Sequence, residues 1–447
     1  MNCVNDYSLI CHVLNLSALE NNVDVVVLLG SFFLLMFIGV PVAISLCLSA
    51  TLYIACFMQI PLLVIGQQML KGVDSFTLMA IPFFVIAGGL MESGGISIRI
   101  VDFAKSLVGH LPGGLAIVTV IASMIFAAMT GAGAATTAAV GGIMIPSMIK
   151  EGYNGGYASA VQAIGGIFGP LIPPSILMVL YSVASGESAG DMLLAGLIPG
   201  LFLGFILLVI VIFQCVKNGY VGVGKFSLKV AIKSFVESIW AILAPVIILG
   251  GIYSGMFTPT EASAIACLYC LIIGLFVYKE LNIKTLGITV FKSVKSAAGI
   301  MMIVAATQAF GWVLTRAGIP QMVAQGFTSV ISDPIVFMFA VVFILIIAGC
   351  FIDAVPALLI FAPILIPAAH AYDVNLIHFG VVIVTTLCIG LATPPVGLNL
   401  FVASSVGKVP VHRIIPHLPI LLLAILVGTL IIVAVPEFST ILPSLMK

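Results

Sequence analysis

Charged side chains are scarce in this sequence. Asp, Glu, Lys and Arg make up 7% of its 447 residues, whereas 62% of the residues are hydrophobic. An ordinary soluble domain has about a quarter of its residues charged, so this composition excludes a water-soluble globular fold. The 16 basic and 16 acidic residues balance, and no basic run indicates a nucleic-acid partner.

Motifs of enzymes and of ATP-driven pumps are also missing. The sequence has no His-Glu-x-x-His, no Gly-x-Ser-x-Gly and no phosphate-binding glycine-lysine loop. Its nine cysteines are scattered, and Cys267 and Cys270 have no second pair with which to complete a zinc site. We therefore predict a protein that is not an enzyme, that carries no organic cofactor, and in which an ion gradient must drive any pumping.

Long apolar runs recur along the chain. Because a hydrocarbon core about 30 Å thick needs about 20 helical residues, these runs predict about ten transmembrane helices. In the first half they lie at 23–39, 41–58, 76–93, 155–185 and 191–216, and in the second half at 234–254, 259–278, 294–315, 377–406 and 414–435.

Two further apolar stretches, 114–149 and 335–369, are interrupted midway by small or helix-breaking residues. The interruptions read Thr130-Gly-Ala-Gly133 and Asp353-Ala-Val-Pro356. They predict two re-entrant helical hairpins rather than simple spans.

The sequence repeats itself at an offset of 221 positions. Its only two Pro-Pro pairs, Pro173-Pro174 and Pro394-Pro395, lie at this offset, and each follows a matched glycine, Gly169 or Gly390. The offset predicts two inverted-topology repeats. The predicted order is an extracytoplasmic segment 1–22, a first repeat 23–216, a cytoplasmic connector 217–233, a second repeat 234–436 and a tail 437–447.

Orientation follows from the basic residues, which stay on the cytoplasmic side of a membrane. With the N-terminus outside, most basic residues fall in cytoplasmic loops, and only Lys71, Arg316 and Lys447 fall outside. We therefore predict that both termini are periplasmic.

Proline removes a backbone donor and clashes with the preceding turn, so residues 169–174 and 390–395 must unwind their helices within the membrane. Non-helical backbone at that depth is tolerated where it is buried in protein or lines a cavity, and there its carbonyls can coordinate a cation. Each break therefore pairs with a hairpin tip. The alternative is a plain proline kink between packed helices.

The groups available at both breaks are backbone carbonyls, hydroxyls and one acid, which suit the hard sodium ion. We predict Na⁺ as the coupling ion, with about two sites. The alternative for the individual glycines and alanines is close helix packing. The first site would comprise Thr130, Gly131, Gly133, Thr136, Gly169, Ile172 and Ser175, and the second Asp353, Ala354, Pro356, Thr393, Val396, Gly397 and Asn399.

Three ionisable residues near the predicted spans need separate interpretation. Asp353 at the second tip is a functional candidate, because an acid within a membrane is costly. Arg316 could bind a substrate carboxylate with its planar fork, or it could be an interfacial anchor. Glu261 follows Phe257-Thr-Pro-Thr260 and fits a partner for a helix N-terminus better than a ligand.

From about Val25 to Pro436 the sequence resembles the large membrane subunit of tripartite ATP-independent periplasmic (TRAP) transporters. The motifs that carry the resemblance are Ala80-Ile-Pro-Phe-Phe-Val-Ile-Ala-Gly88, Leu107-Val-Gly-His110, Gly169-Pro-Leu-Ile-Pro-Pro-Ser175, Gly255-Met-Phe-Thr-Pro-Thr-Glu-Ala262 and Ala392-Thr-Pro-Pro-Val-Gly397.

The resemblance implies sodium-coupled uptake of an organic acid, either sialic acid or a C4-dicarboxylate, across a bacterial inner membrane. It also implies an elevator-type movement and two partners, a small four-helix membrane subunit and a periplasmic substrate-binding protein. By this resemblance Thr130, Ser175, Arg316 and Asp353 would contact the substrate or shape its site. Many members have a Ser-Gly-Ser first tip with a nearby aspartate, whereas this tip reads Thr130-Gly-Ala-Gly-Ala-Ala-Thr136.

Two other functions fit the same architecture. A one-component sodium and anion symporter with similar hairpins would need no partner protein. A passive anion channel is disfavoured, because two occluding hairpins suit alternating access.

Overall fold

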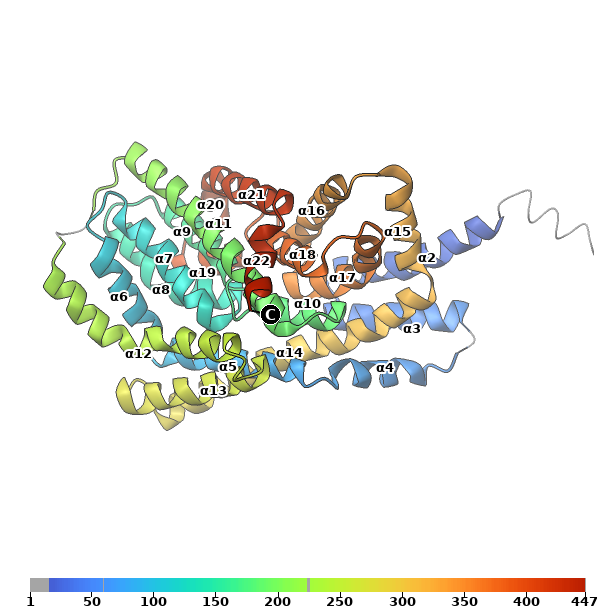
Figure 1. Ribbon diagram of the computed structural model, residues 1–447, viewed down its shortest axis with the longest axis horizontal. Coiled ribbons are helices and arrows are strands. Elements are labelled where there is room, and N and C mark those ends of the chain that lie inside the picture. The colour runs from blue at the N-terminus through green and yellow to red at the C-terminus, as the bar shows by residue number, and fades with distance from the viewer. Residues whose placement is uncertain (1–15, 59, 223–225, 447) are drawn as a thin grey trace, which may run out of the picture.

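The computed structural model describes residues 16–58, 60–222 and 226–446, and describes only the backbone of residues 16–24. Within this part of the chain every regular element is a helix (Figure 1). The all-helical prediction is therefore confirmed. Most of the predicted segment 1–22 lies outside the described residues.

The first half of the chain contains α2 (Leu16–Phe37), α3 (Val42–Phe57), α4 (Leu63–Val73), η1 (Thr77–Met79), α5 (Ala80–Ser93), α6 (Ile96–Val108), α7 (Gly114–Thr130), α8 (Gly133–Lys150), α9 (Gly155–Gly165), η2 (Gly166–Phe168), α10 (Ile176–Ser185) and α11 (Ala189–Lys217). The second half contains α12 (Leu228–Tyr253), α13 (Pro259–Ile272), η3 (Ile273–Val277), α14 (Ile283–Arg316), α15 (Ile319–Val330), α16 (Pro334–Phe351), α17 (Ala354–Ala371), α18 (Leu376–Gly390), α19 (Leu398–Gly407), α20 (Val411–Ile414), η4 (Ile415–His417), α21 (Leu418–Ala434) and α22 (Glu437–Leu445).

The helices are long and apolar enough for a membrane. Among the described residues, 7 helices could each cross a bilayer, or 8 if the pair α4 and η1–α5, bent by 71°, forms one span. Six shorter apolar helices accompany them, including α7, α10, α18 and α19. These lengths confirm a multi-pass membrane fold, but they do not decide the predicted number of spans.

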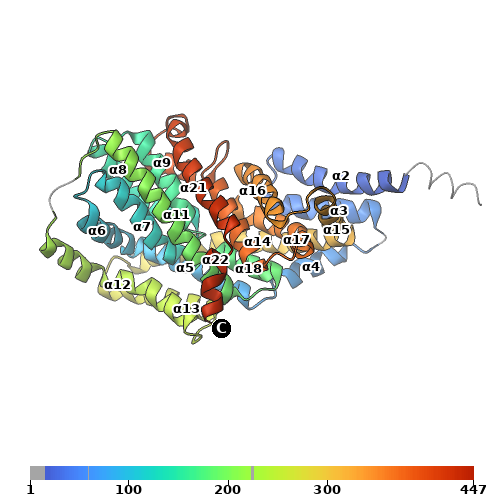
Figure 2. The same cartoon turned by 45° about the horizontal axis from the view of Figure 1, so that its top comes forward.

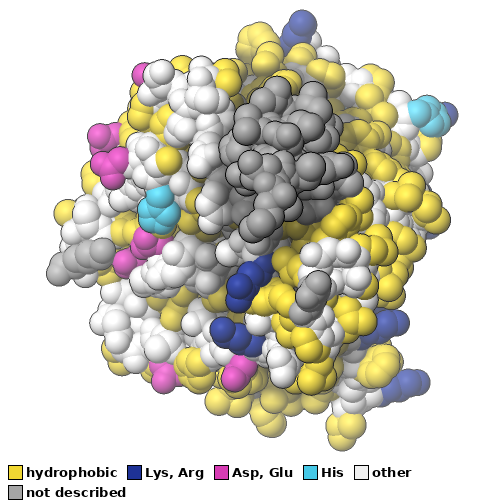
Figure 3. Space-filling model, turned by 90° about the vertical axis from the view of Figure 1, so that its right-hand side faces the viewer, with side chains coloured by type: hydrophobic (Ala, Val, Ile, Leu, Met, Phe, Trp, Pro, Cys, Tyr) yellow, Lys and Arg dark blue, Asp and Glu magenta, His cyan; other side chains and the backbone are white. Residues whose placement is uncertain are grey.

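Large apolar side chains lie on the outer surface. Phe205, Phe213 and Phe343 are each about two-thirds exposed. At the end of the molecule that Figure 3 faces, hydrophobic side chains form a broad patch on the right of the view, and acidic side chains lie mainly on the left. Such a surface suits contact with lipid, because soluble proteins rarely expose contiguous apolar patches of this kind.

The helices repeat at the offset read from the sequence. The hairpin α7–α8 corresponds to α16–α17, and the broken helix α9–α10 corresponds to α18–α19. Asn154 and Asn375 cap equivalent helices, since each side chain accepts hydrogen bonds from the two backbone N–H groups two and three residues ahead. Figures 1 and 2 both show α7–α8 and α16–α17 as separate hairpins on either side of the middle of the molecule.

The helices form two groups. The frame consists of α2–α5 and α12–α14, in which α14 packs against α3, α4 and α5, and α13 packs against α5. The hairpin body consists of α7–α11 and α16–α21, in which α8 packs against α19, and α16 packs against α18. Helix α6 lies between them, in contact with both α12 and α7. In Figure 1 much of the frame lies along the lower edge, and both hairpins lie above it.

Four helices lie outside the predicted spans. They are α4, α6, α15 and α22, and α22 occupies what the sequence predicted as a tail. Each of these helices is amphipathic and has no long apolar run of its own, and long apolar runs were the basis of the predicted spans. Helix α14 also begins at Ile283, eleven residues before the predicted 294, because capping by Asn282 extends it into the polar loop.

We expect Gly169→Ala and Gly390→Ala to lower the melting temperature of the purified protein in detergent. An added Cβ at Gly169 would lie 2.5 Å from the carbonyl oxygen of Ala132, and one at Gly390 would lie 2.6 Å from the Cα of Gly349. The facing backbone would have to move, and overpacking of this kind costs about 1–3 kcal/mol.

Gly250→Ala in α12 is the matched control, because no atom lies within 4 Å of its Cβ position. There the substitution should hold or raise the melting temperature, since Ala is favoured over Gly in a helix by about 1 kcal/mol. Equal behaviour of all three variants would contradict the close packing of hairpin and break.

Candidate functional site

The first broken helix is interrupted between η2 and α10, and the tip of the first hairpin lies in the gap. The tip turns at Gly131, whose φ of +63° favours glycine. The backbone N–H of Ile176 donates to the carbonyl of Gly131 at 3.5 Å. An added Cβ at Gly131 would lie 2.6 Å from the carbonyl oxygen of Pro174. The tip and the break are therefore in backbone contact.

The second break is built in a similar way. The backbone N–H of Val396 donates to the carbonyl of Cys350 at the end of α16, at 3.1 Å. The N–H of Asn399 donates across the break to the carbonyl of Leu391 at 2.8 Å. Gly397, at φ +49°, precedes the first residue of α19. Neither break is the plain proline kink that remained an alternative, because each interrupts its helix over several residues and contacts a hairpin.

The predicted hydroxyls of the first site lie together and are buried. The side-chain oxygens of Thr130 and Thr136 are 3.0 Å apart. Ser175 caps α10, where its hydroxyl accepts from the N–H of Met178 at 3.1 Å and donates to the carbonyl of Pro170. Thr130 is 2% exposed, and Thr136 and Ser175 are fully buried.

The backbone of Asn399 lies at the second break, as predicted, but its side chain reaches the first break. The sequence groups it with Asp353 at the second site, but its amide lies against the first break, where its Nδ2 donates to the carbonyl of Ala163 at 3.4 Å. Its Oδ1 is buried and has no hydrogen-bond partner. An added Cβ at Gly133 would lie 3.0 Å from this Oδ1 and 3.0 Å from the carbonyl oxygen of Gly166. Oxygens from both repeats therefore converge beside the first tip.

Sequence reasoning missed two polar residues of this cluster, Thr137 and Gln162. The hydroxyl of Thr137 donates to the carbonyl of Gly133 at 2.9 Å. The Nε2 of Gln162 donates to the carbonyl of Thr136 at 3.3 Å. Both are fully buried polar side chains. Gln162 could have been singled out, because an uncharged polar side chain within an apolar run needs a partner.

The second site is more open than the first. Asp353 is exposed at the N-terminus of α17, and Ala354 and Pro356 are buried in the first turn. The hydroxyl of Thr393, within the break, donates to the carbonyl of Ile389 near the end of α18, at 2.7 Å. Val396 is 44% exposed. The first break is enclosed, whereas the second presents its acid and part of its backbone at the surface.

Arg316 lies apart from both breaks. It is exposed at the end of α14, with its guanidinium 5.3 Å from the ring centroid of Trp312. Ile300, the last residue of this helix to line the cavity at the first tip, precedes Arg316 by sixteen residues, or about 24 Å along the axis. The neighbouring Thr315 and Trp312 line a different cavity. The position fits the interfacial anchor at least as well as it fits a substrate ligand.

Glu261 takes the predicted place at a helix N-terminus. Its carboxylate accepts from the N–H of Thr258 at 2.8 Å, and its own N–H donates to the hydroxyl of Thr258 at 3.3 Å. The two residues form a capping box at the start of α13. Glu261 therefore has a structural role.

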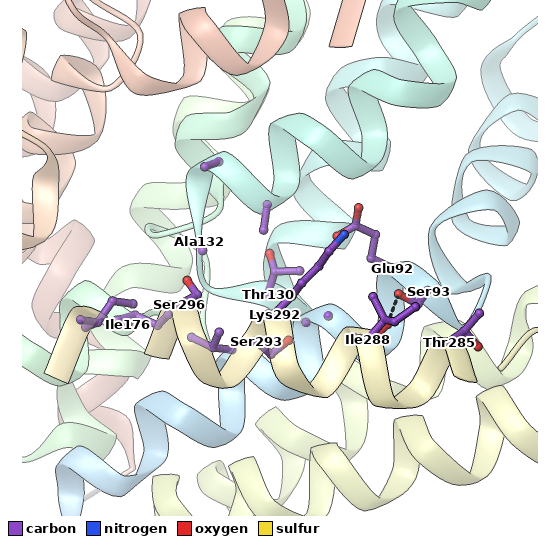
Figure 4. A pocket seen from close by; sticks show the side chains of 17 residues that line it. Glu92, Ser93, Thr130, Ala132, Ile176, Thr285, Ile288, Lys292, Ser293 and Ser296 are labelled. Atoms are coloured by element: carbon purple, nitrogen blue, oxygen red, sulfur yellow. Dashed lines mark hydrogen bonds between the residues drawn. The ribbon is translucent and has the colours of Figure 1, made fainter. Parts of the chain in front are cut away.

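A cavity of about 480 Å³ reaches the first tip from the frame (Figure 4). It lies between α5, the N-terminal half of α14, the first hairpin and the start of α10. Its lining residues are Val85, Gly88, Gly89, Glu92, Ser93, Thr130, Ala132, Ala134, Ala135, Ile176, Thr285, Ile288, Thr289, Lys292, Ser293, Ser296 and Ile300.

A second cavity, of about 340 Å³, follows the C-terminal half of α14. It is lined by Thr307, Gln308, Trp312 and other residues of α4, α10, α14 and α17. None of its described lining residues belongs to a hairpin tip. The candidate site is therefore reached by the cavity at one end of α14 and not by the cavity at the other.

Comparison with known proteins gives consistent results. The family described as "Tripartite ATP-independent periplasmic transporter, DctM component" matches residues 29–438. The sialic acid TRAP transporter large permease protein SiaM of Vibrio cholerae is 39% identical over 411 residues, which cover 92% of this chain and 96% of that protein. The C4-dicarboxylate TRAP transporter large permease protein DctM of Pseudomonas aeruginosa is 40% identical over 400 residues, covering 90% and 94%.

A longer relative is also similar. The isethionate TRAP transporter permease protein DctMQ of Oleidesulfovibrio alaskensis is 38% identical over 416 residues, which cover 92% of this chain and 66% of that protein. Among solved structures, the YdaH transporter of Alcanivorax borkumensis has a similar fold, with a TM-score of 0.59 at 15% identity, covering 83% of this chain and 86% of that one.

We expect Thr136→Val to lower the melting temperature. The substitution removes the hydroxyl that lies 3.0 Å from the hydroxyl of Thr130 and donates to the carbonyl of Ala132. Each buried hydrogen bond lost costs about 1 kcal/mol. Thr315→Val is the control, because that hydroxyl is exposed and donates to the carbonyl of Gly311 within its own helix. A control that loses as much stability as Thr136→Val would show that the buried pair contributes little.

Proposed function

This chain belongs to the DctM family of tripartite ATP-independent periplasmic (TRAP) transporters, and from this membership we propose that it imports a small organic acid by sodium-coupled alternating access. The family match and the large-permease relatives confirm the resemblance that the motifs indicated, and they identify a transporter rather than an enzyme. The relatives transport sialic acid and C4-dicarboxylates, and we take these two acids as the candidate substrates.

The observation that carries the proposal is the unpartnered Oδ1 of Asn399. A buried carbonyl oxygen without a donor is costly, and it calls for a cation or an ordered water. The carbonyl oxygen of Gly166 lies near it, since both oxygens are 3.0 Å from the Cβ position of Gly133. Sodium accepts such neutral oxygen ligands, whereas zinc and redox metals prefer nitrogen and sulfur. We therefore propose one Na⁺ at this position and a second near Asp353 and the second break.

The arrangement of helices supports alternating access. The hairpin body carries both breaks, and the frame contacts it through α14 and α17, α5 and α7, and α6. The cavity along the N-terminal half of α14 is lined in part by Thr130 of the first hairpin tip. The described lining residues of the cavity along its C-terminal half include no residue of a hairpin tip. We propose that the hairpin body moves past the frame in an elevator-type cycle, and that the present state is open at the end of α14 that carries Ile283. With both termini periplasmic in a bacterial inner membrane, that end is cytoplasmic.

The proposal includes two protein partners. Members of this family work with a small four-helix membrane subunit and with a periplasmic protein that delivers the substrate. About a third of the DctMQ relative lies outside the match, which leaves room for a fused subunit. The competing function is a one-component symporter of the same fold, which would transport without either partner.

The direct test is uptake of labelled N-acetylneuraminate and succinate into proteoliposomes that contain this chain and its small subunit, with the binding protein outside. We expect accumulation only with an inward sodium gradient and only with the binding protein present. Uptake that does not depend on the sodium gradient would contradict the proposed sodium coupling. Uptake by this chain alone would favour the one-component symporter, and unitary currents would indicate a channel.

We expect Asn399→Leu to reduce the stabilisation that sodium gives, because it removes one of the two proposed ion sites. A ligand at ten times its dissociation constant stabilises the folded state by about 1.4 kcal/mol per site. The wild-type melting temperature should therefore be higher in sodium chloride than in choline chloride, and the difference should be smaller in the variant. Asn218→Leu, at the exposed end of α11, should keep the difference. An unchanged sodium effect in Asn399→Leu would contradict the ion position.

We expect Asp353→Ala to lose transport while the protein still inserts and folds. The side chain is exposed at the N-terminus of α17, so its removal should cost ion or substrate binding more than stability. Asp333→Ala is an informative comparison, because that acid caps α16 through the N–H groups of Ile335 and Val336 and should affect stability instead. Wild-type uptake by Asp353→Ala would remove the residue from the mechanism.

A further inference from the structure

Helix α14 presents a polar stripe to the cavity at the first tip. The stripe consists of Thr285, Thr289, Lys292, Ser293 and Ser296, whose spacings of three and four residues place them on one helical face. A stripe of this kind within an apolar helix is costly unless it faces protein, water or a ligand. Figure 4 shows it facing the hairpin tip across the cavity.

Two opposite charges lie in this cavity. Among its described lining residues, Lys292 is the only cation and Glu92 is the only anion. No nitrogen-to-oxygen distance of 4.0 Å or less joins them, since the salt bridges of the described residues lie elsewhere. In Figure 4 the side chain of Lys292 extends from α14 toward α5, where Glu92 lies. Both charged groups therefore face the same cavity, where a ligand can meet them.

The remaining polar groups of the cavity are hydroxyls. The hydroxyls of Ser93 and Thr289 are 2.8 Å apart and bridge α5 to α14. Gly89 leaves room for Ser293, because an added Cβ there would lie 2.3 Å from the hydroxyl oxygen of Ser293. Thr130 connects the same cavity to the first hairpin tip. Hydroxyls both donate and accept, so they match the hydroxyls of a polyol.

We infer that this cavity binds a polyhydroxylated monocarboxylic acid, a sugar acid, with Lys292 on its carboxylate and with Glu92 and the hydroxyls on its hydroxyl groups. This inference rests on the proposed transport function and selects among its substrates. The cavity volume of about 480 Å³ lies within the range of small-molecule sites. Lys292 is therefore a specificity-determining residue contributed by the frame.

The pairing of charges disfavours a dicarboxylate. A second carboxylate would meet no second cation among the described lining residues and would approach Glu92, and like charges repel. A zwitterion could use both charged side chains, but it would leave most of the cavity hydroxyls without partners. The large number of hydroxyls favours the sugar acid.

The test measures binding directly to the complex of this chain and its small subunit in detergent, without the delivery protein, so that the selectivity of that protein does not enter. The probes are N-acetylneuraminate, gluconate, succinate and the zwitterion taurine. We expect both sugar acids to bind at least tenfold more tightly than succinate or taurine. Lys292→Gln should weaken the binding of both sugar acids at least tenfold, and Lys292→Arg should weaken their binding less.

Lys295→Gln is the matched control, because Lys295 lies on the same helix but not among the cavity residues. It should change affinity less than twofold. Glu92→Gln should reduce the difference in binding affinity between succinate and the sugar acids. Preference of the wild type for succinate or taurine, or unchanged sugar-acid affinity in Lys292→Gln, would overturn the inference. Failure of the transport proposal is a separate result, namely absence of sodium-driven uptake of every probe by the wild-type complex.

Discussion

The structure depends on a constraint that lipid imposes on the backbone. In a hydrocarbon layer every N–H and C=O must find a partner within the protein, so a helix can be interrupted only where other protein covers the gap. Here Gly131 contacts the first break and Cys350 contacts the second. The hairpins therefore make the interruptions possible, and the interruptions free the carbonyls that give the site its oxygens.

The two repeats are interlocked as well as symmetric. Asn399 comes from the second repeat but places its amide beside Gly133 and Gly166 of the first. The Asn399 amide can approach the backbone this closely because both neighbours are glycines, and a side chain at either position would occupy the same space. A shift of one repeat against the other would separate these oxygens, so the geometry of the cluster reports on the packing of the whole hairpin body.

Most of the architecture could be predicted from the sequence. The apolar runs, the two Pro-Pro pairs and the matched residues Asn154 and Asn375 reflect local requirements of helices in lipid, which a sequence records directly. The cross-repeat position of Asn399 could not be predicted, because it follows from tertiary packing. Nor could the cavity charges, since Glu92 and Lys292 each resemble an ordinary interfacial charge at the end of a span and become neighbours only when α5 packs against α14.

In the proposed cycle, the unequal exposure of the two breaks would give the ions at the two sites different exchange rates. The polar groups of the first break are sealed by its tip, whereas Asp353 and Val396 at the second lie at the surface. In the proposed cycle, an ion at the second break exchanges with its surroundings without any rearrangement, and an ion at the first must wait for the tip to separate from the break. The proposed cycle would therefore release the two ions in a fixed order, with the enclosed ion last.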